Sequence, residues 1–146
     1  MRRPFLLLVL IGSVALAACA PRLAPPGGLA GAPAAPAAVE RFLQLAAERD
    51  YSGMGWVFGT AEGPVIRRDP VGEVEQRMYA LANLLAYDSF VVGAGNPVPG
   101  RPGEAITFNL VIRRGQQSYQ VPTIAVRGPQ NRWFVEQLAV DALAAQ

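Results

Sequence analysis

Histidine and lysine are absent from this sequence of 146 residues, and cysteine occurs once, at Cys19. All 13 basic residues are therefore arginine. Without these residue types the chain has no imidazole base, no serine–histidine or cysteine–histidine nucleophile pair and no Schiff-base lysine. A zinc site built from cysteine and histidine is excluded as well. Carboxylates, hydroxyl groups and arginine remain, so we expect a protein that is not an enzyme and holds no metal or cofactor.

The N-terminal residues have the pattern of an export signal. Arg2 and Arg3 form a positive start, an apolar run extends from Pro4 to Leu16, and small residues then lead to Cys19. The run is shorter than the roughly 20 residues that a membrane-spanning helix needs. The residues Leu16-Ala17-Ala18-Cys19 resemble the lipobox of bacterial lipoproteins. This resemblance implies that residues 1–18 are a signal peptide that is removed, and that Cys19 is then acylated.

The lipobox resemblance also implies where the mature protein resides. Two or more acyl chains hold a protein stably at a membrane, so the membrane is one expected partner and a protein of the cell envelope is another. Ala20 follows the cysteine where an aspartate would favour the inner membrane, so we expect the outer membrane, facing the periplasm. The alternative is a soluble secreted protein with Cys19 near the cleavage site by chance. A lone thiol in an oxidising compartment would then lack a partner.

The distribution of charge argues against nucleic acid as a partner. The formal net charge is +2, and Arg2 and Arg3 in the predicted signal account for it. Without these two, 11 arginines face 11 acidic residues. A formally neutral domain has no basic field for a phosphate backbone.

Residues 19–38 combine the anchor cysteine with a segment rich in alanine, proline and glycine, which has little to bury. We expect a linker that spans between about 25 Å as a flexible coil and about 60 Å as a polyproline rod. The spacing of its prolines argues against a helix built from its alanines. The folded domain is expected to comprise residues 39–146.

Two helices are predicted first within the domain. Apolar residues at helical spacing indicate a helix from Val39 to near Asp50, and residues 51–58 indicate a second, short turn of helix. Glycines at 53, 55 and 59 follow a spacing one residue longer than the dinucleotide-binding fingerprint. We therefore interpret them as sites of backbone packing or as a loop.

A brief strand at Val65–Arg67 and a long helix over residues 70–86 are predicted next. Asp69 and Pro70 have the residue types of an N-cap and a first helical position. Glu73 is placed four residues before Arg77, which favours an ion pair. The helix presents an apolar stripe to a core.

The rest of the chain has the pattern of extended segments joined by turns. The clearest is Ala105–Arg113, whose apolar and polar residues alternate as in a strand with one buried face. Frequent glycine and proline predict a loop over residues 93–103. Pro122 argues for an edge position or a bulge in its strand. The predicted strands are Ser89–Val92, Ala105–Arg113, Ser118–Val126 and Trp133–Val140, followed by a short tail.

Helices followed by about four antiparallel strands predict an α+β fold with the helices on one face of a curved sheet. The order helix, short helix from Asp50-Tyr51 to Phe58-Gly59, brief strand, long helix, and strands ending in Arg132-Trp133-Phe134-Val135 resembles the NTF2-like (cystatin-like) cone. The resemblance covers residues 39–140 and implies a conical pocket between the sheet and the long helix. That family contains ketosteroid-isomerase-like and dehydratase-like enzymes as well as inert modules, so the fold does not define the function.

Few residues are candidates for a site. By resemblance to enzymes with an aspartate base and a tyrosine, Asp88 with Tyr79 or Tyr87 is the one catalytic grouping on offer. Its alternative is a structural role for all three residues. Arg67 and Arg68 are candidates for binding an anionic headgroup or a carboxylate, although exposed arginines beside a helix start are ordinary. The candidate lining of an apolar pocket is Phe108, Leu110, Trp133 and Phe134.

Two functions follow from these observations. The first is a membrane-anchored, non-enzymatic module that binds a partner in the cell envelope. The second is a binder of a small apolar ligand in the cone, or a weak isomerase or dehydratase acting there. An open pocket would favour the second function, and a pocket filled by its own side chains would oppose it. The identity of the ligand or partner and the oligomeric state are left open.

Overall fold

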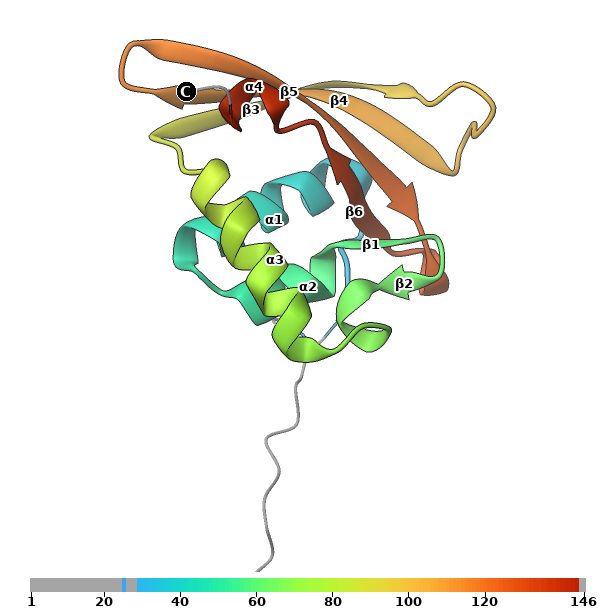
Figure 1. Cartoon of the computed structure of the whole chain (residues 1–146). Helices are drawn as coiled ribbons and strands as arrows, with labels where there is room; N and C mark the ends of the chain where they lie inside the picture. The colour runs from blue at the N-terminus through green and yellow to red at the C-terminus, as the bar shows by residue number, and fades with distance from the viewer. Residues whose placement is uncertain (1–24, 26–28, 145–146) are drawn as a thin grey trace, which may run out of the picture.

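The computed structural model describes residue 25 and residues 29–144. The predicted signal peptide and Cys19 lie outside these residues. The described chain forms an α+β domain in which helices cover one face of a four-stranded antiparallel sheet (Figure 1). No helix in the described part is long and apolar enough to cross a membrane.

The first helix, α1, spans Ala35–Glu48 and begins four residues before the predicted start at Val39. Pro36 lies in its first turn, where a missing N–H costs nothing, because the first helical N–H groups have no partner within the helix. The segment before α1 is also part of the domain. The Gly31 N–H donates to the Trp56 carbonyl at 2.8 Å, and Ala32 pairs with Trp133. The predicted linker boundary at residue 38 is thus too late.

The second helix, α2, spans Tyr51–Val57 and confirms the predicted short helix. The Asp50 carboxylate caps it by accepting from the Gly53 N–H at 2.8 Å. Gly55 faces the long helix, and a Cβ atom at this position would lie 2.8 Å from a methyl group of Val74. The glycine therefore allows close packing of the two helices, in agreement with the interpretation of this segment as a site of backbone packing.

The region between α2 and the long helix differs from the prediction. Two short strands, β1 (Gly59–Thr60) and β2 (Gly63–Pro64), form a hairpin. Val65–Arg67, predicted as a strand, forms a single turn of 3-10 helix instead. Its last backbone bond joins the Arg68 N–H to the Val65 carbonyl. The β1–β2 hairpin ends at Pro64, and the chain turns after the Val65 N–H donates to the Phe58 carbonyl at 2.8 Å.

The long helix, α3, spans Val71–Leu84, within the predicted 70–86. Pro70, with an extended ψ of 129°, takes the N-cap position predicted for Asp69. The Asp69 carboxylate instead accepts from Arg77. The predicted partner of Arg77, Glu73, is therefore replaced by a residue before the helix.

The sheet consists of β3 (Ser89–Pro97), β4 (Ala105–Arg114), β5 (Gln117–Arg127) and β6 (Trp133–Leu138), in this order. The alternation predicted for β4 is confirmed: Phe108 is buried and its neighbour Asn109 is exposed. The loop predicted from residue 93 is wrong in its first part, because β3 continues to Pro97 after an irregularity between Val92 and Gly95.

Pro122 lies in β5, which has neighbours on both sides, although an edge strand or a bulge was predicted for it. The pairing with β6 ends at Thr123, the next residue. The Pro122 carbonyl accepts from the Ala139 N–H at 2.9 Å, so the proline main chain faces the end of β6. Its missing N–H therefore leaves the pairing with β4 intact. The C-terminal segment, predicted as a tail, forms a short helix, α4 (Asp141–Ala144), with Leu143 buried.

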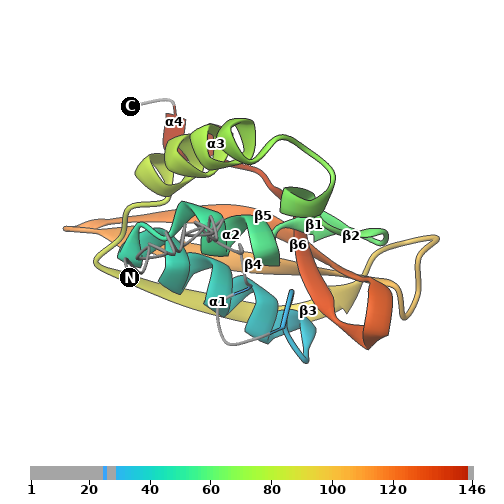
Figure 2. The same ribbon diagram turned by 90° about the horizontal axis from the view of Figure 1, so that it is seen from below.

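The core lies between the sheet and the helices (Figure 2). Helix α1 contacts β5 and β6, and α3 packs against α1 and α2. Phe42, Leu43 and Leu45 of α1 are fully buried in this core. The β1–β2 hairpin is joined to the main sheet where Phe58 forms a parallel bridge with Val135 of β6.

Candidate functional site

Three of the candidate lining residues of the expected conical pocket are packed in the hydrophobic core. Phe108 and Trp133 are 4% and 7% exposed, and both belong to the hydrophobic core. Leu110 is fully buried beside them. Neither Phe108 nor Trp133 lines either of the two cavities described below. The prediction that they line a ligand site therefore gives way to a packing role.

Asp88, a candidate for a catalytic base whose alternative was a structural role, is a turn residue. Its carboxylate accepts from the Gly115 N–H at 2.6 Å, and its own N–H donates to the Arg113 carbonyl at 2.9 Å. These bonds fasten the turn between β4 and β5 to the start of β3. The side chain is exposed to solvent rather than held in an apolar pocket. Asp88 therefore lacks the apolar surroundings of a base in a buried pocket.

The two candidate tyrosines have partners other than Asp88. Tyr79 is 54% exposed on α3, and its ring centre lies 5.5 Å from that of Tyr51 in an edge-to-face arrangement. The Tyr87 hydroxyl donates to the Leu43 carbonyl at 3.3 Å. Burial, with a smaller contribution from the negative charge of Glu48, raises the pKa of Tyr87. The neutral hydroxyl is thus favoured, and the structure gives the three residues of the candidate catalytic grouping separate partners.

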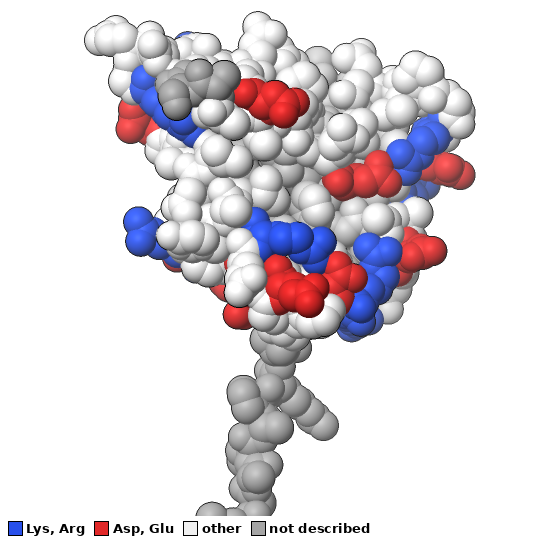
Figure 3. All heavy atoms as spheres, viewed as in Figure 1, with Lys and Arg blue, Asp and Glu red and all other residues white. Residues whose placement is uncertain are grey.

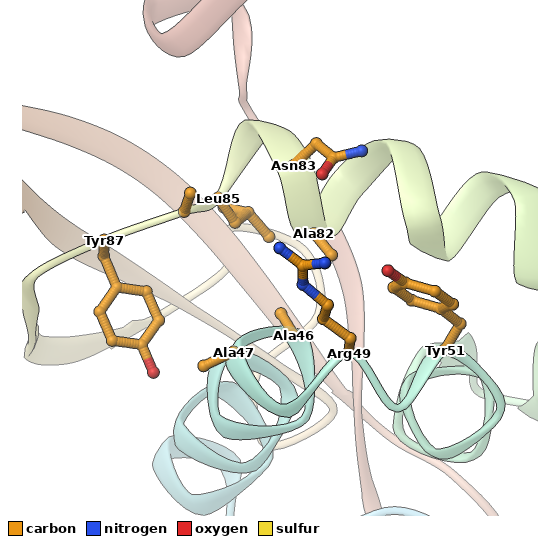
Figure 4. Close-up of a pocket in the computed structure, with 9 residues that line it drawn as sticks. Ala46, Ala47, Arg49, Tyr51, Ala82, Asn83, Leu85 and Tyr87 are labelled. Carbon is orange, nitrogen blue, oxygen red and sulfur yellow. The ribbon is translucent and has the colours of Figure 1, made fainter.

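Tyr87 instead lines a cleft between the ends of α1 and α3 that has a volume of about 220 Å³ (Figure 4). We call it the α1–α3 cleft. Small side chains leave the space open, because alanines from both helices form much of its wall. The lining residues are Ala46, Ala47, Arg49, Tyr51, Ala82, Asn83, Leu85, Ala86 and Tyr87.

Arg49 supplies the positive charge of the α1–α3 cleft. It follows the last residue of α1 with a φ of 59°, a left-handed conformation that is unfavourable for residues with a side chain. Its backbone N–H caps the helix by donating to the Ala46 and Leu45 carbonyls. The guanidinium extends into the cleft (Figure 4), and no ion pair joins it to another described residue. Sequence reasoning missed Arg49, because glycine is the usual signal for this conformation.

The chemistry available in the α1–α3 cleft is binding. Its lining contains a guanidinium, an amide at Asn83 and two phenols, but no carboxylate. Arginine stays protonated and cannot act as a base, and the raised pKa of Tyr87 keeps that phenol neutral. A carboxylate or phosphate group would complement this lining. Elsewhere in the described residues no acidic cluster is suited to hold a metal ion.

The second cavity, of about 240 Å³, lies where the N-terminal segment joins the domain. We call it the arginine pocket. The predicted pair Arg67 and Arg68 lines it, together with Arg132, which sequence reasoning missed. Phe134 and Leu29 are among its apolar walls. Charges of both signs are interleaved over the helical half of the molecule (Figure 3), and Arg68 accordingly forms an ion pair with Glu62 at 3.0 Å.

Comparisons with known proteins provide no family for this chain. No protein-family model matches it, and no curated protein or solved structure matches it either.

Proposed function

We propose that this protein is a lipid-anchored, non-enzymatic binding module of the bacterial cell envelope. Cys19 carries the acyl chains, and the domain faces the periplasm from the outer membrane. The observation that carries this proposal is the sequence Leu16-Ala17-Ala18-Cys19, preceded by an apolar run and two arginines. The start of the compact domain by Gly31 supports it, because only a short connection then separates the folded part from the lipid.

We also assign the domain to the NTF2-like type. Support comes from the order of elements: a helix, a short helix, a hairpin, a long helix and a four-stranded meander. The parallel bridge between Phe58 and Val135 adds the hairpin to the edge of the sheet beyond β6, and the sheet curves over the helices (Figure 1). The filled interior distinguishes this domain from a cone with an open pocket.

The filled interior favours the binding module over an enzyme or a binder of apolar ligands in the cone. Asp88 is exposed at a turn, and the candidate tyrosines point elsewhere. The α1–α3 cleft has a lining suited to binding, because Arg49, which forms no ion pair with a described residue, lies there among small side chains. We therefore place the binding of a partner group that carries a carboxylate or phosphate in this cleft.

Replacing Cys19 by serine tests the anchor. Cells that express the protein are grown with labelled fatty acid, and we expect the label on the wild-type chain in the outer-membrane fraction. The Cys19→Ser variant should carry no label, because the acceptor thiol is gone. The Ala20→Asp variant is the matched control, which should keep the label but shift toward the inner membrane. A Cys19→Ser chain that still incorporates label would refute the lipobox interpretation.

Filling the α1–α3 cleft tests the binding site. The chain from Ala20 onward is incubated with extract of its own cell envelope and then analysed by native mass spectrometry. We expect a retained small molecule or peptide on the wild type and a loss of at least tenfold with Ala47→Leu, which places a larger side chain at the wall of the cleft.

Ala80→Leu is the control for this experiment. Ala80 is also an exposed alanine on a helix, but it lies outside the cleft lining, so the retained mass should be unchanged. Equal retention by wild type and Ala47→Leu would show that binding occurs elsewhere. Turnover of the retained molecule would contradict the non-enzymatic assignment.

A further inference from the structure

We propose that the arginine pocket binds the phosphate of an anionic phospholipid in the same membrane that holds the anchor. This inference rests on the proposed function for the presence of a membrane beside the domain. It adds a second membrane contact, made by the folded domain itself. The argument depends on the charge of the pocket, on how its arginines are held, and on where the pocket lies along the chain.

The charge of the arginine pocket is positive although the mature chain is formally neutral. Three arginines and a single acidic residue, Glu62, line it. The arginines come from segments far apart in the sequence: Arg67 and Arg68 precede α3, and Arg132 precedes β6. Guanidinium groups match phosphate oxygens with paired N–H donors. Three arginines that line one cavity are suited to a single phosphate rather than to a long polyanion.

Arg67 and Arg132 are held in place and keep donors for a ligand, whereas Arg68 is paired with Glu62 at 3.0 Å. The Arg67 guanidinium stacks 5.2 Å from the centre of the Trp56 ring and has no hydrogen-bond partner among the described residues. Arg132 donates through Nε and Nη2 to the Ala30 and Gly31 carbonyls, both at 3.0 Å. Because a guanidinium has five N–H donors, Arg132 retains three. Little side-chain entropy is then lost when a phosphate binds.

Apolar groups border the charged part of the pocket. Phe134, Pro64 and Pro129 contribute to its wall, and Leu29 is 55% exposed at its rim. Leu29 also borders an adjoining open groove of about 410 Å³ beside α1. Arginine next to an exposed apolar side chain is typical of surfaces that lie at a membrane interface, where the headgroup binds the charge and the acyl region accepts the apolar group.

The place of the pocket along the chain selects a lipid as the occupant. Ala30 and Gly31, whose carbonyls hold Arg132, follow Cys19 in the sequence by 11 and 12 residues. Nine residues, 20–28, separate the anchor from Leu29, and a chain of this length spans at most about 32 Å. The tether therefore keeps the pocket near the headgroups at a high effective concentration. Because of this high effective concentration, a weak contact with one phosphate is sufficient to hold the domain at the membrane surface.

The test uses the chain from Ala20 onward, without the acyl chains. Every described element and all the core residues lie between residues 29 and 144, so this chain retains the whole domain. Binding is measured by co-sedimentation at low salt with vesicles of phosphatidylcholine, alone or mixed with phosphatidylglycerol. We expect binding to the mixed vesicles only. Arg67→Gln with Arg68→Gln should weaken it roughly thirtyfold, since each arginine near an anionic surface contributes about fivefold.

Arg113→Gln with Arg127→Gln is the matched control, because it changes the net charge equally at exposed positions outside the pocket. It should weaken binding by less than threefold, and thermal unfolding of both double variants confirms that they fold. An equal loss of vesicle binding in the two double variants would overturn the proposal that the arginine pocket binds the phospholipid. So would equal binding to both vesicle types, or complete competition by inorganic phosphate, which would identify a free anion as the ligand. The fatty-acid label on Cys19 is read separately, so failure here leaves the anchor result standing.

Discussion

Phe42→Ala is expected to lower the free energy of unfolding by about 3–5 kcal/mol, the usual cost of removing a fully buried phenylalanine. Phe42 is 0% exposed in the middle of α1, and its ring centre lies 5.7 Å from that of Phe58. Its removal loses the burial of the ring and leaves a cavity that the surrounding helices and sheet close only in part. Urea unfolding of the chain from Ala20 onward, followed by circular dichroism, measures this loss.

The size of this loss also tests the function. Phe42 belongs to the same core cluster as Phe108 and Trp133, which were candidates for the lining of an apolar pocket. Val91→Ala is the control: Val91 is 56% exposed on β3, and its replacement should change stability by about 0.5 kcal/mol or less. If Phe42→Ala cost no more than the control, the interior would not be tightly packed. The hypothesis that the domain binds an apolar ligand in its interior would then be favoured.

The sequence predicts a helix or strand well where that element buries one of its faces, since the apolar residues then recur at a regular spacing. In β4 the alternation of Phe108 and Leu110 with Asn109 defines the buried side without reference to any partner strand. In α3, Val74 and Met78 recur at helical spacing and are buried as expected. Such patterns are local, so they are visible before the partners are known.

Segments rich in glycine and proline are decided by their tertiary partners, and here the prediction was less successful. Gly95 lies in β3, where a loop was predicted. A Cβ atom at this position would lie 2.7 Å from the Phe108 ring, so a residue with a side chain would clash there. The strand needs a glycine to pass over that ring. Pro33 and Pro36 similarly indicated a linker, but Pro36 fits the first turn of α1. Composition alone does not distinguish these cases from disordered chain.

The candidate sites also divide into residues that a local pattern identifies and residues whose place depends on distant parts of the chain. Arg67 and Arg68 could be identified as a possible anion site because they are adjacent in sequence. Arg132 could not, since its position depends on carbonyl groups about a hundred residues away. Asp88 follows Tyr87 directly in sequence, yet the chain turns into β3 at this point and separates the two side chains. Proximity in sequence is thus a poor guide to a site at a junction between elements.

Gly31→Ala is expected to lower the free energy of unfolding by about 2–4 kcal/mol, through a strained backbone and a steric clash. Gly31 has a φ of +66°, and an added Cβ would lie 2.7 Å from the Trp133 carbonyl oxygen and 2.9 Å from the Phe134 ring. The main chain on both sides is fixed by hydrogen bonds, so it has little freedom to move away. Urea unfolding measures the change.

Gly72→Ala is the control for this substitution. Gly72 is exposed in the first turn of α3, and nothing lies within 4 Å of an added Cβ. Alanine at such a site should raise the free energy of unfolding by about 0.4–1 kcal/mol, because it restricts the unfolded chain and favours helix. The same change from glycine to alanine is thus expected to lower the free energy of unfolding at position 31 and to raise it at position 72. If Gly31→Ala behaved like Gly72→Ala, residues 29–34 would be linker, as their composition predicts.

Gly31 also connects the stability of the domain to the arginine pocket. Its carbonyl holds Arg132, so a displaced Gly31 would release one of the three guanidinium groups from its position. We therefore expect Gly31→Ala to weaken binding to vesicles that contain phosphatidylglycerol, under conditions where the domain is still folded. Gly72→Ala should leave this binding unchanged. A loss of stability without a loss of vesicle binding would separate the two roles, and Arg67 and Arg68 alone would then form the site.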